Sequence, residues 1–350
     1  MSRGVESASS SLRDGIGLSA LLVVALAVRA FAWSRTVVLF NDGPIFLAMA
    51  EAVSRGQGEA LLQHPYHPLY PVLIALVGVG PIPLETAAVA VSILGGLLAV
   101  IGIFVFVRHA FDRELAWMAA WAVALHPWAV DFSSDVMSDG LYAGFYLLGF
   151  AAMVRLIDEP TPRRALACGG WAGLAYLVRP EGIELLAFAA ILLAVRSLRA
   201  PQIRLRALGA GLVLLISGAA LIAPLVLAVG IETGDYALTR KKSLVQLASG
   251  SPATQPPARI PEPATEPSRK DQGEGREPGV RLPLPESAVR ADAPGAERPP
   301  RSPGGLVAAI LRSWATSLAA FRFELLGFAL VGLWLTRADR RIAREGALGL

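Results

Sequence analysis

The sequence predicts an all-α, polytopic helical membrane protein with about 8 transmembrane helices. Apolar residues make up 54% of the 350 residues and charged residues only 17%. The mean hydropathy is +0.52. Soluble domains average about 45–50% apolar and about 25% charged residues. Apolar runs close to the length of about 20 residues that crosses a bilayer recur along the chain. This composition therefore favours a membrane protein.

The individual spans are predicted from these runs. They are 15–32, 84–107, 115–130, 140–157, 165–178, 183–195, 208–229 and 321–335. Several are shorter than about 20 residues, so flanking aromatic and Arg side chains must complete the crossing. Arg29, near the end of the first span, is expected to snorkel to the interface. Ala30-Phe31-Ala32 leaves a cleaved signal peptide as an alternative for this span.

Five parts follow from the spans. Residues 1–14 are predicted to form a polar, loose cytoplasmic N-terminus, and 15–230 the transmembrane core with an outer loop at 33–83. Pro, Glu, Arg and Ser dominate much of 231–305, which predicts an extracytoplasmic, partly disordered loop. Residues 306–336 are predicted to form an interfacial helix and the last span. Residues 337–350 are then a cytoplasmic tail, expected to be truncated or to end a short family member.

The first outer loop has a helical pattern of its own. Apolar residues recur at three-to-four spacing over 45–53, and Gly56 and Gly58 end the pattern. This predicts an interfacial helix that lies along the membrane. A short apolar segment at 69–79 follows Pro65 and Pro68.

Arginine alternates between the loops. The loops predicted to be inside carry Arg3, Arg13, Arg108, Arg113, Arg155, Arg163, Arg164, Arg196, Arg199, Arg204, Arg206, Arg337, Arg340, Arg341 and Arg344. The opposite loops carry Asp42, His64, His67, Asp131, Asp135, Asp139, Arg179 and Glu181. The positive-inside rule then places the N-terminus in the cytoplasm and any polar chemistry at the outer face.

Two acidic features could carry chemistry, a single aspartate and a group of three. Asp42 precedes the interfacial helix, and the helix dipole stabilises a carboxylate at this position. Its alternative role is an ordinary N-cap. Asp131, Asp135 and Asp139 are spaced by four, so a continuous helix would stack them on one face. Such a stripe needs a cation, an Arg or a raised pKa. A solvated helix start, with neighbouring serines as caps, is the alternative.

Basic and histidine positions are more ambiguous. Arg179 could bind a phosphate through a bidentate contact, or it could anchor the interface in an ion pair with Glu181 or Glu184. His64 and His67 could supply two metal ligands from one turn, but no carboxylate is adjacent.

Several functions find no support. The net charge of +4 does not suggest nucleic acid, because the arginines lie mostly in short loops. Cys168 is the sole cysteine, so there is no disulfide framework. No P-loop, dinucleotide-binding motif or nucleophile elbow is present.

The motifs, in this order, resemble the polyprenyl-phosphate-sugar-dependent glycosyltransferases of the GT-C fold. Among these, the sequence resembles protein O-mannosyltransferases, lipid A aminoarabinose transferases and Rgt-type transferases. The matching motifs are Asp42, Arg55-Gly56, His67-Pro68-Leu69-Tyr70-Pro71, Ser134-Asp135, Ser138-Asp139, Leu177-Val178-Arg179-Pro180-Glu181 and Phe321-Arg322-Phe323-Glu324-Leu325-Leu326. Two features depart from the family. Gly43 follows Asn41-Asp42 where the family often has an Asp-Glu pair, and the late spans that usually close the donor cavity are missing.

The resemblance implies roles for individual residues. The first-loop acid of the family is the catalytic base, which is Asp42 here. Its second-loop acid helps to bind metal or acceptor, which is Asp139, with Asp135 as the alternative. A divalent metal cation is thus one option as cofactor, with no other cofactor expected. Substrate contacts are expected from Arg179, Glu181, His64, His67 and Tyr70.

The predicted function is an inverting glycosyltransferase of the bacterial inner membrane. It moves a sugar from a polyprenyl-phosphate donor to a lipid, glycan or protein acceptor at the outer face, and its partners are this donor and the membrane lipids. Two alternatives remain. A secondary transporter or flippase would need midplane charges and internal repeats, and a non-catalytic membrane scaffold would need neither.

Overall fold

The described part of the chain is entirely helical apart from its turns and loops. The structure is a computed structural model that describes residues 2–233 and residue 238, with the side chains of residues 2–12, 63 and 233 left out. The helices are α1 (Ser2–Arg35), α2 (Gly43–Ser54), α3 (Glu59–Gln63), α4 (Leu69–Val77), α5 (Leu84–Ala110), α6 (Arg113–Leu125), α7 (Pro127–Ser133), α8 (Asp139–Asp158), α9 (Pro162–Val178), α10 (Ile183–Arg199) and α11 (Arg204–Thr233), with short 3₁₀ helices η1 (Pro180–Gly182) and η2 (Pro201–Ile203). This confirms the all-α prediction. The predicted regions 306–336 and 337–350, and nearly all of 231–305, lie outside the described residues.

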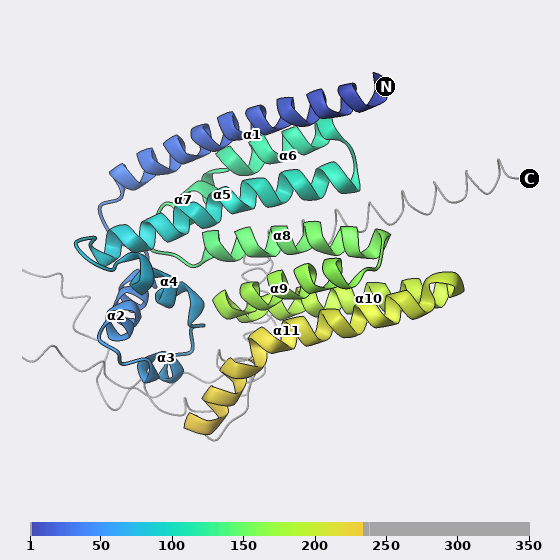
Figure 1. The fold of residues 1–350 in the computed structure, drawn as a ribbon. Coiled ribbons are helices and arrows are strands. Elements are labelled where there is room, and N and C mark those ends of the chain that lie inside the picture. Colours follow the sequence, from blue (N-terminus) through green and yellow to red (C-terminus); the bar gives the residue numbers. More distant parts are fainter. Residues whose placement is uncertain (1, 234–237, 239–350) are drawn as a thin grey trace, which may run out of the picture. The chain divides into compact units, whose positions relative to one another are not determined.

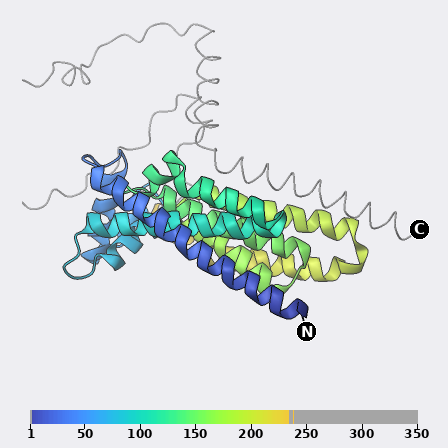
Figure 2. The same ribbon diagram turned by 90° about the horizontal axis from the view of Figure 1, so that it is seen from above.

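The long helices form one bundle with their axes roughly aligned. Across it, α1 and α6 lie on one side, α5 and α8 in the middle, and α9, α10 and α11 on the other side (Figure 1). The short helices α2, α3 and α4 gather at one end of the bundle, which a second view confirms (Figure 2). The helix α11 bends near Pro224, where the ring removes a backbone hydrogen bond.

Four of the described helices are long and apolar enough to cross a membrane. They are Arg13–Arg35, Leu84–Ala110, Asp139–Asp158 and Pro201–Glu232. The predicted spans within α6, α9 and α10 have helices of 13, 17 and 17 residues, below the length of a full crossing. The predicted total of about 8 spans is therefore not confirmed, although the membrane class is.

The outward faces of the bundle are apolar. On α1 and α11, large hydrophobic side chains such as Phe31, Leu205 and Ile216 are 66%, 85% and 60% exposed. An apolar surface of this kind fits hydrocarbon and would be unfavourable in water. The two helices thus border the lipid, while α5 and α8 form the core.

Glycines bring α5 and α8 into close contact. A side chain at Gly95 would overlap the backbone of Leu141, and one at Gly144 would lie 2.6 Å from the Gly95 carbonyl oxygen. Both glycines therefore allow the two helix backbones to approach, as small residues do between membrane helices. This packing fixes the position of the α8 N-terminus.

Two predictions differ from the structure, one for the N-terminal segment and one for the predicted span 115–130. The helix α1 begins at Ser2, so residues 2–14, which were predicted to be loose, are helical. The predicted span 115–130 is broken at His126, which is extended, and α7 starts at Pro127. Pro127 cannot donate a hydrogen bond and disfavours helical backbone in the residue before it.

Arg29 does not snorkel to the interface. Its side chain is fully buried among α1, α5, α6 and α7. Its Nε donates a hydrogen bond of 2.7 Å to the Ser133 hydroxyl, and Nη1 donates one of 3.1 Å to the Ala124 carbonyl. Because α6 breaks at His126, the Ala124 carbonyl lacks a helical partner. The buried Arg29 guanidinium donates a hydrogen bond to this carbonyl, and the dipole of α6 stabilises a cation at its C-terminal end.

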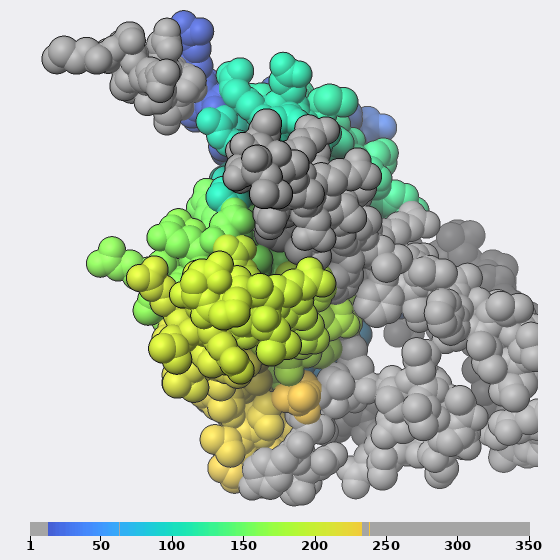
Figure 3. All heavy atoms as spheres, turned by 90° about the vertical axis from the view of Figure 1, so that its right-hand side faces the viewer, coloured from blue at the N-terminus to red at the C-terminus, as the bar shows by residue number. Residues whose placement is uncertain are grey.

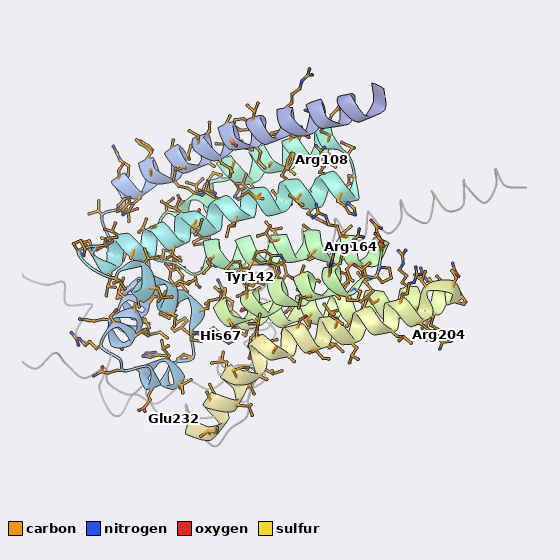
Figure 4. All side chains as sticks on the ribbon, in the orientation of Figure 1. His67, Arg108, Tyr142, Arg164, Arg204 and Glu232 are labelled. Atoms are coloured by element: carbon orange, nitrogen blue, oxygen red, sulfur yellow. The ribbon has the colours of Figure 1, made fainter. Side chains whose placement is uncertain are left out.

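Charged loops separate to the two ends of the bundle. Arg108, Arg164 and Arg204 lie at one end, which we call the arginine end, whereas His67 and Tyr142 lie toward the other (Figure 4). Asp14 near the start of α1 pairs with Arg108 and, at 2.6 Å, with Arg113. We call the opposite end, where Asp42 and Asp139 are found, the carboxylate end.

The contact between α5 and α8 predicts the cost of a single methyl group. We expect Gly95→Ala to destabilise the protein by roughly 1–3 kcal/mol, because its methyl group meets backbone that cannot move away easily. The matched change is Gly170→Ala in α9, where nothing lies within 4 Å of the new atom. That variant should be neutral or slightly more stable, since Ala favours helix over Gly. Thermal unfolding in detergent compares them, and equal melting temperatures would contradict the packing described.

Candidate functional site

Asp42 stands at the N-terminus of α2 but does not cap it. It occupies the N-cap position, and its side chain makes no capping hydrogen bond. Its backbone carbonyl accepts from Ile45 and Phe46, both at 3.1 Å. The carboxylate is half-buried. The structure therefore leaves this side chain to other partners, in contrast to the capping alternative.

Tyr66 is the side-chain partner of Asp42. Burial raises the pKa of the Tyr66 phenol, as do the hydrogen bond to Asp42 and its negative charge, while the charge of Arg179 acts against this shift. The same effects place three groups from separate loops within electrostatic reach. The Tyr66 phenol and the Asp42 carboxylate are therefore close enough to interact.

Arg179 joins the ends of α8 and α9. Its Nη1 donates to a carboxylate oxygen of Asp139, the first residue of α8, and its Nε lies 3.7 Å from an oxygen of Glu181. The guanidinium also lies over the ring of Tyr142, 5.8 Å from its centre. The Arg179, Asp139 and Glu181 side chains are about a quarter to a third exposed, at 27%, 30% and 26%. Arg179 is thus held in a fixed position that still faces solvent.

Asp135 connects the two acidic loops. Its carboxylate accepts a hydrogen bond of 3.1 Å from the backbone N–H of Phe40 and one of 2.6 Å from that of Val136. The first contact ties the loop before Asp42 to the loop before α8. Gly43 packs against Val136 in the same place. A Cβ atom added at Gly43 would lie 3.4 Å from Val136, so a larger side chain would have little room here.

The predicted stripe of three aspartates does not form. Asp131 lies in α7, Asp135 lies in the turn after it, and Asp139 begins α8. The helix ends at Ser133, and the hydrogen bonds of Asp135 to backbone N–H groups stabilise the turn instead. The three carboxylates therefore do not stack on one helix face.

His64 and His67 border a small cavity beside this site. The cavity holds about 20 Å³ and is also lined by Tyr66, Tyr176 and Leu238, among others. His67 is buried, with its ring edge-on to that of Tyr176 at 4.8 Å. The Tyr176 hydroxyl donates a hydrogen bond of 2.6 Å to the Leu238 carbonyl. A space of this size accommodates about one water molecule.

Tyr70, predicted to touch substrate, is fully buried. Its hydroxyl lies 2.7 Å from the Ser92 hydroxyl, which donates to the Met137 carbonyl. This chain of hydrogen bonds joins α4, α5 and the loop before α8. Tyr70 therefore stabilises the loop before α8 through Ser92 and does not face the site itself. The aromatic residues that do reach the site are Tyr66 and Tyr142, which the sequence analysis did not single out.

The proposed metal ligands are engaged by other groups. Within residues 13–232, no group of three His, Cys, Asp or Glu side chains is arranged to hold a metal ion. Asp139 is paired with Arg179, and both oxygens of Asp135 accept backbone N–H groups. These two carboxylates do not form a ready set of ligands, so no chemical step is assigned to a metal here.

The fold and this site together define a helical membrane protein with Asp42 and the Arg179–Asp139 ion pair at one end of the bundle. The family model of the dolichyl-phosphate-mannose-protein mannosyltransferases, within the GT-C superfamily, matches residues 63–227. This match confirms the predicted resemblance. It supports a membrane glycosyltransferase that uses a polyprenyl-phosphate-linked sugar. No curated protein and no solved structure matches significantly.

The matched region covers most of the site but not all of it. His64, His67, Asp139, Arg179 and Glu181 lie within residues 63–227, and Asp42 precedes them. The role of Asp42 therefore depends on the geometry around it, above all on its interaction with Tyr66, which the charge of Arg179 also reaches.

Arg29 secures the loop that carries Asp135. We predict that Arg29→Met speeds amide hydrogen exchange in residues 124–134 by about tenfold, which corresponds to about 1.4 kcal/mol. The reason is the loss of the donor to the Ala124 carbonyl. Arg35→Met, an exposed change in the same helix, is the control. Exchange that is equally slow in both variants would show that Arg29 does not hold this corner.

Proposed function

We propose that this protein is an inverting glycosyltransferase with Asp42 as its general base. The donor is a polyprenyl-phosphate-linked sugar, and the acceptor is a hydroxyl group of a lipid, glycan or protein. The observation that carries the proposal is the state of Asp42. It is half-buried, does not cap its helix, and interacts with Tyr66, a phenol that the charge of Arg179 also reaches.

The chemical step needs a base and a group that stabilises the leaving phosphate. Asp42 takes the proton of the acceptor hydroxyl as its oxygen forms a bond to the anomeric carbon. The bond between that carbon and the phosphate oxygen breaks, and polyprenyl phosphate leaves with the electron pair. A single displacement of this kind inverts the anomeric configuration.

Arg179 is suited to bind the leaving phosphate. A guanidinium presents N–H donors in a planar fork that matches phosphate oxygens. Glu181, at 3.7 Å from Nε, lies beyond ordinary hydrogen-bonding distance. It is therefore the partner that a phosphate could most easily replace. Asp139 would keep the guanidinium in place during the exchange, and the fixed charge would stabilise the developing anion.

The membrane supplies the donor to this end of the bundle. The polyprenyl chain would lie against the outward apolar faces, with the phosphate at the carboxylate end. By the positive-inside rule, the arginine end faces the cytoplasm. The site would then open at the outer face of the plasma membrane, in a bacterial cell the inner membrane.

The first test substitutes Asp42 in the full chain. In proteoliposomes with polyprenyl-phosphate mannose and a membrane extract as acceptor, Asp42→Asn should reduce sugar transfer by about 10²–10⁴-fold. Asn keeps the size and the capping ability of Asp, so folding should not change. Glu51→Gln, an exposed carboxylate on α2 that pairs with Arg55, is the matched control. An Asn variant that transfers sugar like the wild type would remove Asp42 from the mechanism and leave Asp139 as the next candidate.

The second test concerns the metal. Because Arg179 already neutralises Asp139, we expect sugar transfer to persist in excess EDTA. Loss of transfer in EDTA, restored by a divalent cation and less easily restored in Asp139→Asn, would instead assign Asp135 and Asp139 to a metal ion.

A further inference from the structure

A cavity at the arginine end lies far from the proposed site. It holds about 450 Å³ and is formed where α8, α9, α10 and α11 begin or end. Its lining includes Asp158, Glu159, Thr161, Arg196, Arg206 and Gly209. Ligand pockets in proteins range from about 300 to 1,000 Å³. Figure 3 looks onto this end of the bundle, with the yellow-green and yellow surface of α10 and α11 below the green surface of the helices before them.

The acidic residues of the cavity have basic partners outside its lining. Asp158 lies 2.7 Å from the His109 ring, and Glu159 lies 2.7 Å from Arg164. Neither His109 nor Arg164 lines the cavity. Each carboxylate of the lining thus has a basic partner outside the cavity, whereas the basic groups of the lining itself are the two guanidinium groups of Arg196 and Arg206.

Two arginines face the cavity. Arg196 donates a hydrogen bond of 2.8 Å to the Asp158 carbonyl, and its Nε is buried without a hydrogen-bonding partner among the described residues. Arg206 is exposed at the start of α11. The N-terminus of α9 also opens here, at Thr161 and Pro162, and adds partial positive charge. The cavity is therefore built for an anion.

The surroundings indicate which anion. The adjoining face of α11 carries Leu205, Leu208 and Leu212, which are 85%, 55% and 59% exposed. α11 is itself long and apolar enough to span the membrane. A ligand here thus meets cations at one end and an apolar helix surface directly beside them. Basic pockets between membrane helices bind the head groups of anionic lipids.

We propose that this cavity binds the phosphate head group of an anionic phospholipid. The phosphate lies between Arg196 and Arg206, and the acyl chains follow the exposed leucines of α11. The site is separate from the glycosyltransferase site and does not depend on the proposed reaction. Its occupant holds together the ends of α8, α9, α10 and α11.

The experiment compares lipids of equal acyl chains bound to the purified full chain. Native mass spectrometry counts retained phosphatidylglycerol and phosphatidylcholine, and thermal unfolding measures their stabilisation. The wild type should retain phosphatidylglycerol preferentially. Arg206→Gln should weaken this by about tenfold, whereas Arg204→Gln, which removes the same charge from the same helix outside the cavity, should not.

A second pair of variants fills the cavity without changing its charge. Nothing lies within 4 Å of a side chain added at Gly209, which lines the cavity, or at Gly211, which does not. We expect Gly209→Phe to lose the phosphatidylglycerol preference and Gly211→Phe to keep it. Equal losses in Arg206→Gln and Arg204→Gln would reduce the effect to general surface charge, and equal losses in the two Phe variants would show that the lipid does not bind in this cavity. Either result would overturn the proposal. Equal stabilisation by inorganic phosphate alone, or no lipid preference in the wild type, would overturn it as well.

Discussion

The ion pair between Arg179 and Asp139 is the contact on which the carboxylate end depends. A charge at the edge of an apolar bundle is unfavourable unless another charge or a hydrogen bond compensates it. Asp139 begins α8, and Arg179 follows α9, so their attraction fixes the mutual position of both helix ends. The close packing of α5 and α8 delivers Asp139 to this position. Tyr66, which interacts with Asp42, lies within reach of the charge of the same arginine.

The two ends of the bundle present different chemistry for the same reason. Between them, the long helices offer few positions for a charge, so charged residues collect in the turns. Arg29 is the charged side chain that lies fully buried in the described part of the bundle. Its partners are a hydroxyl and backbone carbonyls rather than a carboxylate. Arg29 stabilises the C-terminal end of α6. This role is structural and does not support the transporter alternative.

The sequence predicted the helices and their two ends, because hydropathy and arginine alternation depend on the membrane rather than on tertiary contacts. It failed where the tertiary structure decided. Arg29 was predicted to be interfacial because it lies near the end of the first apolar run. The sequence around it does not show that α6 ends beside it. The spacing of Asp131, Asp135 and Asp139 suggested a helical stripe, but the turn stabilised by Asp135 separates them.

Within the site, sequence patterns found the charged residues but not their partners. Asp42, Asp139 and Arg179 are recognisable from their place in the outer loops. The pairing of Arg179 with Asp139 and of Tyr66 with Asp42 joins residues far apart in the chain, and no local pattern predicts it. Tyr66 stands between two histidines that attract attention as metal ligands. Its hydroxyl gains a role only when the loop folds against α2.

The most direct measurement is an experimental structure of the full chain in a lipid nanodisc with a non-transferable polyprenyl-phosphate sugar analogue. The account predicts the phosphate in contact with the Arg179 guanidinium, with Glu181 displaced and the anomeric carbon facing Asp42. A phosphate bound at the arginine end, or bound at the carboxylate end with Asp42 still turned to Tyr66 and away from the sugar, would contradict it.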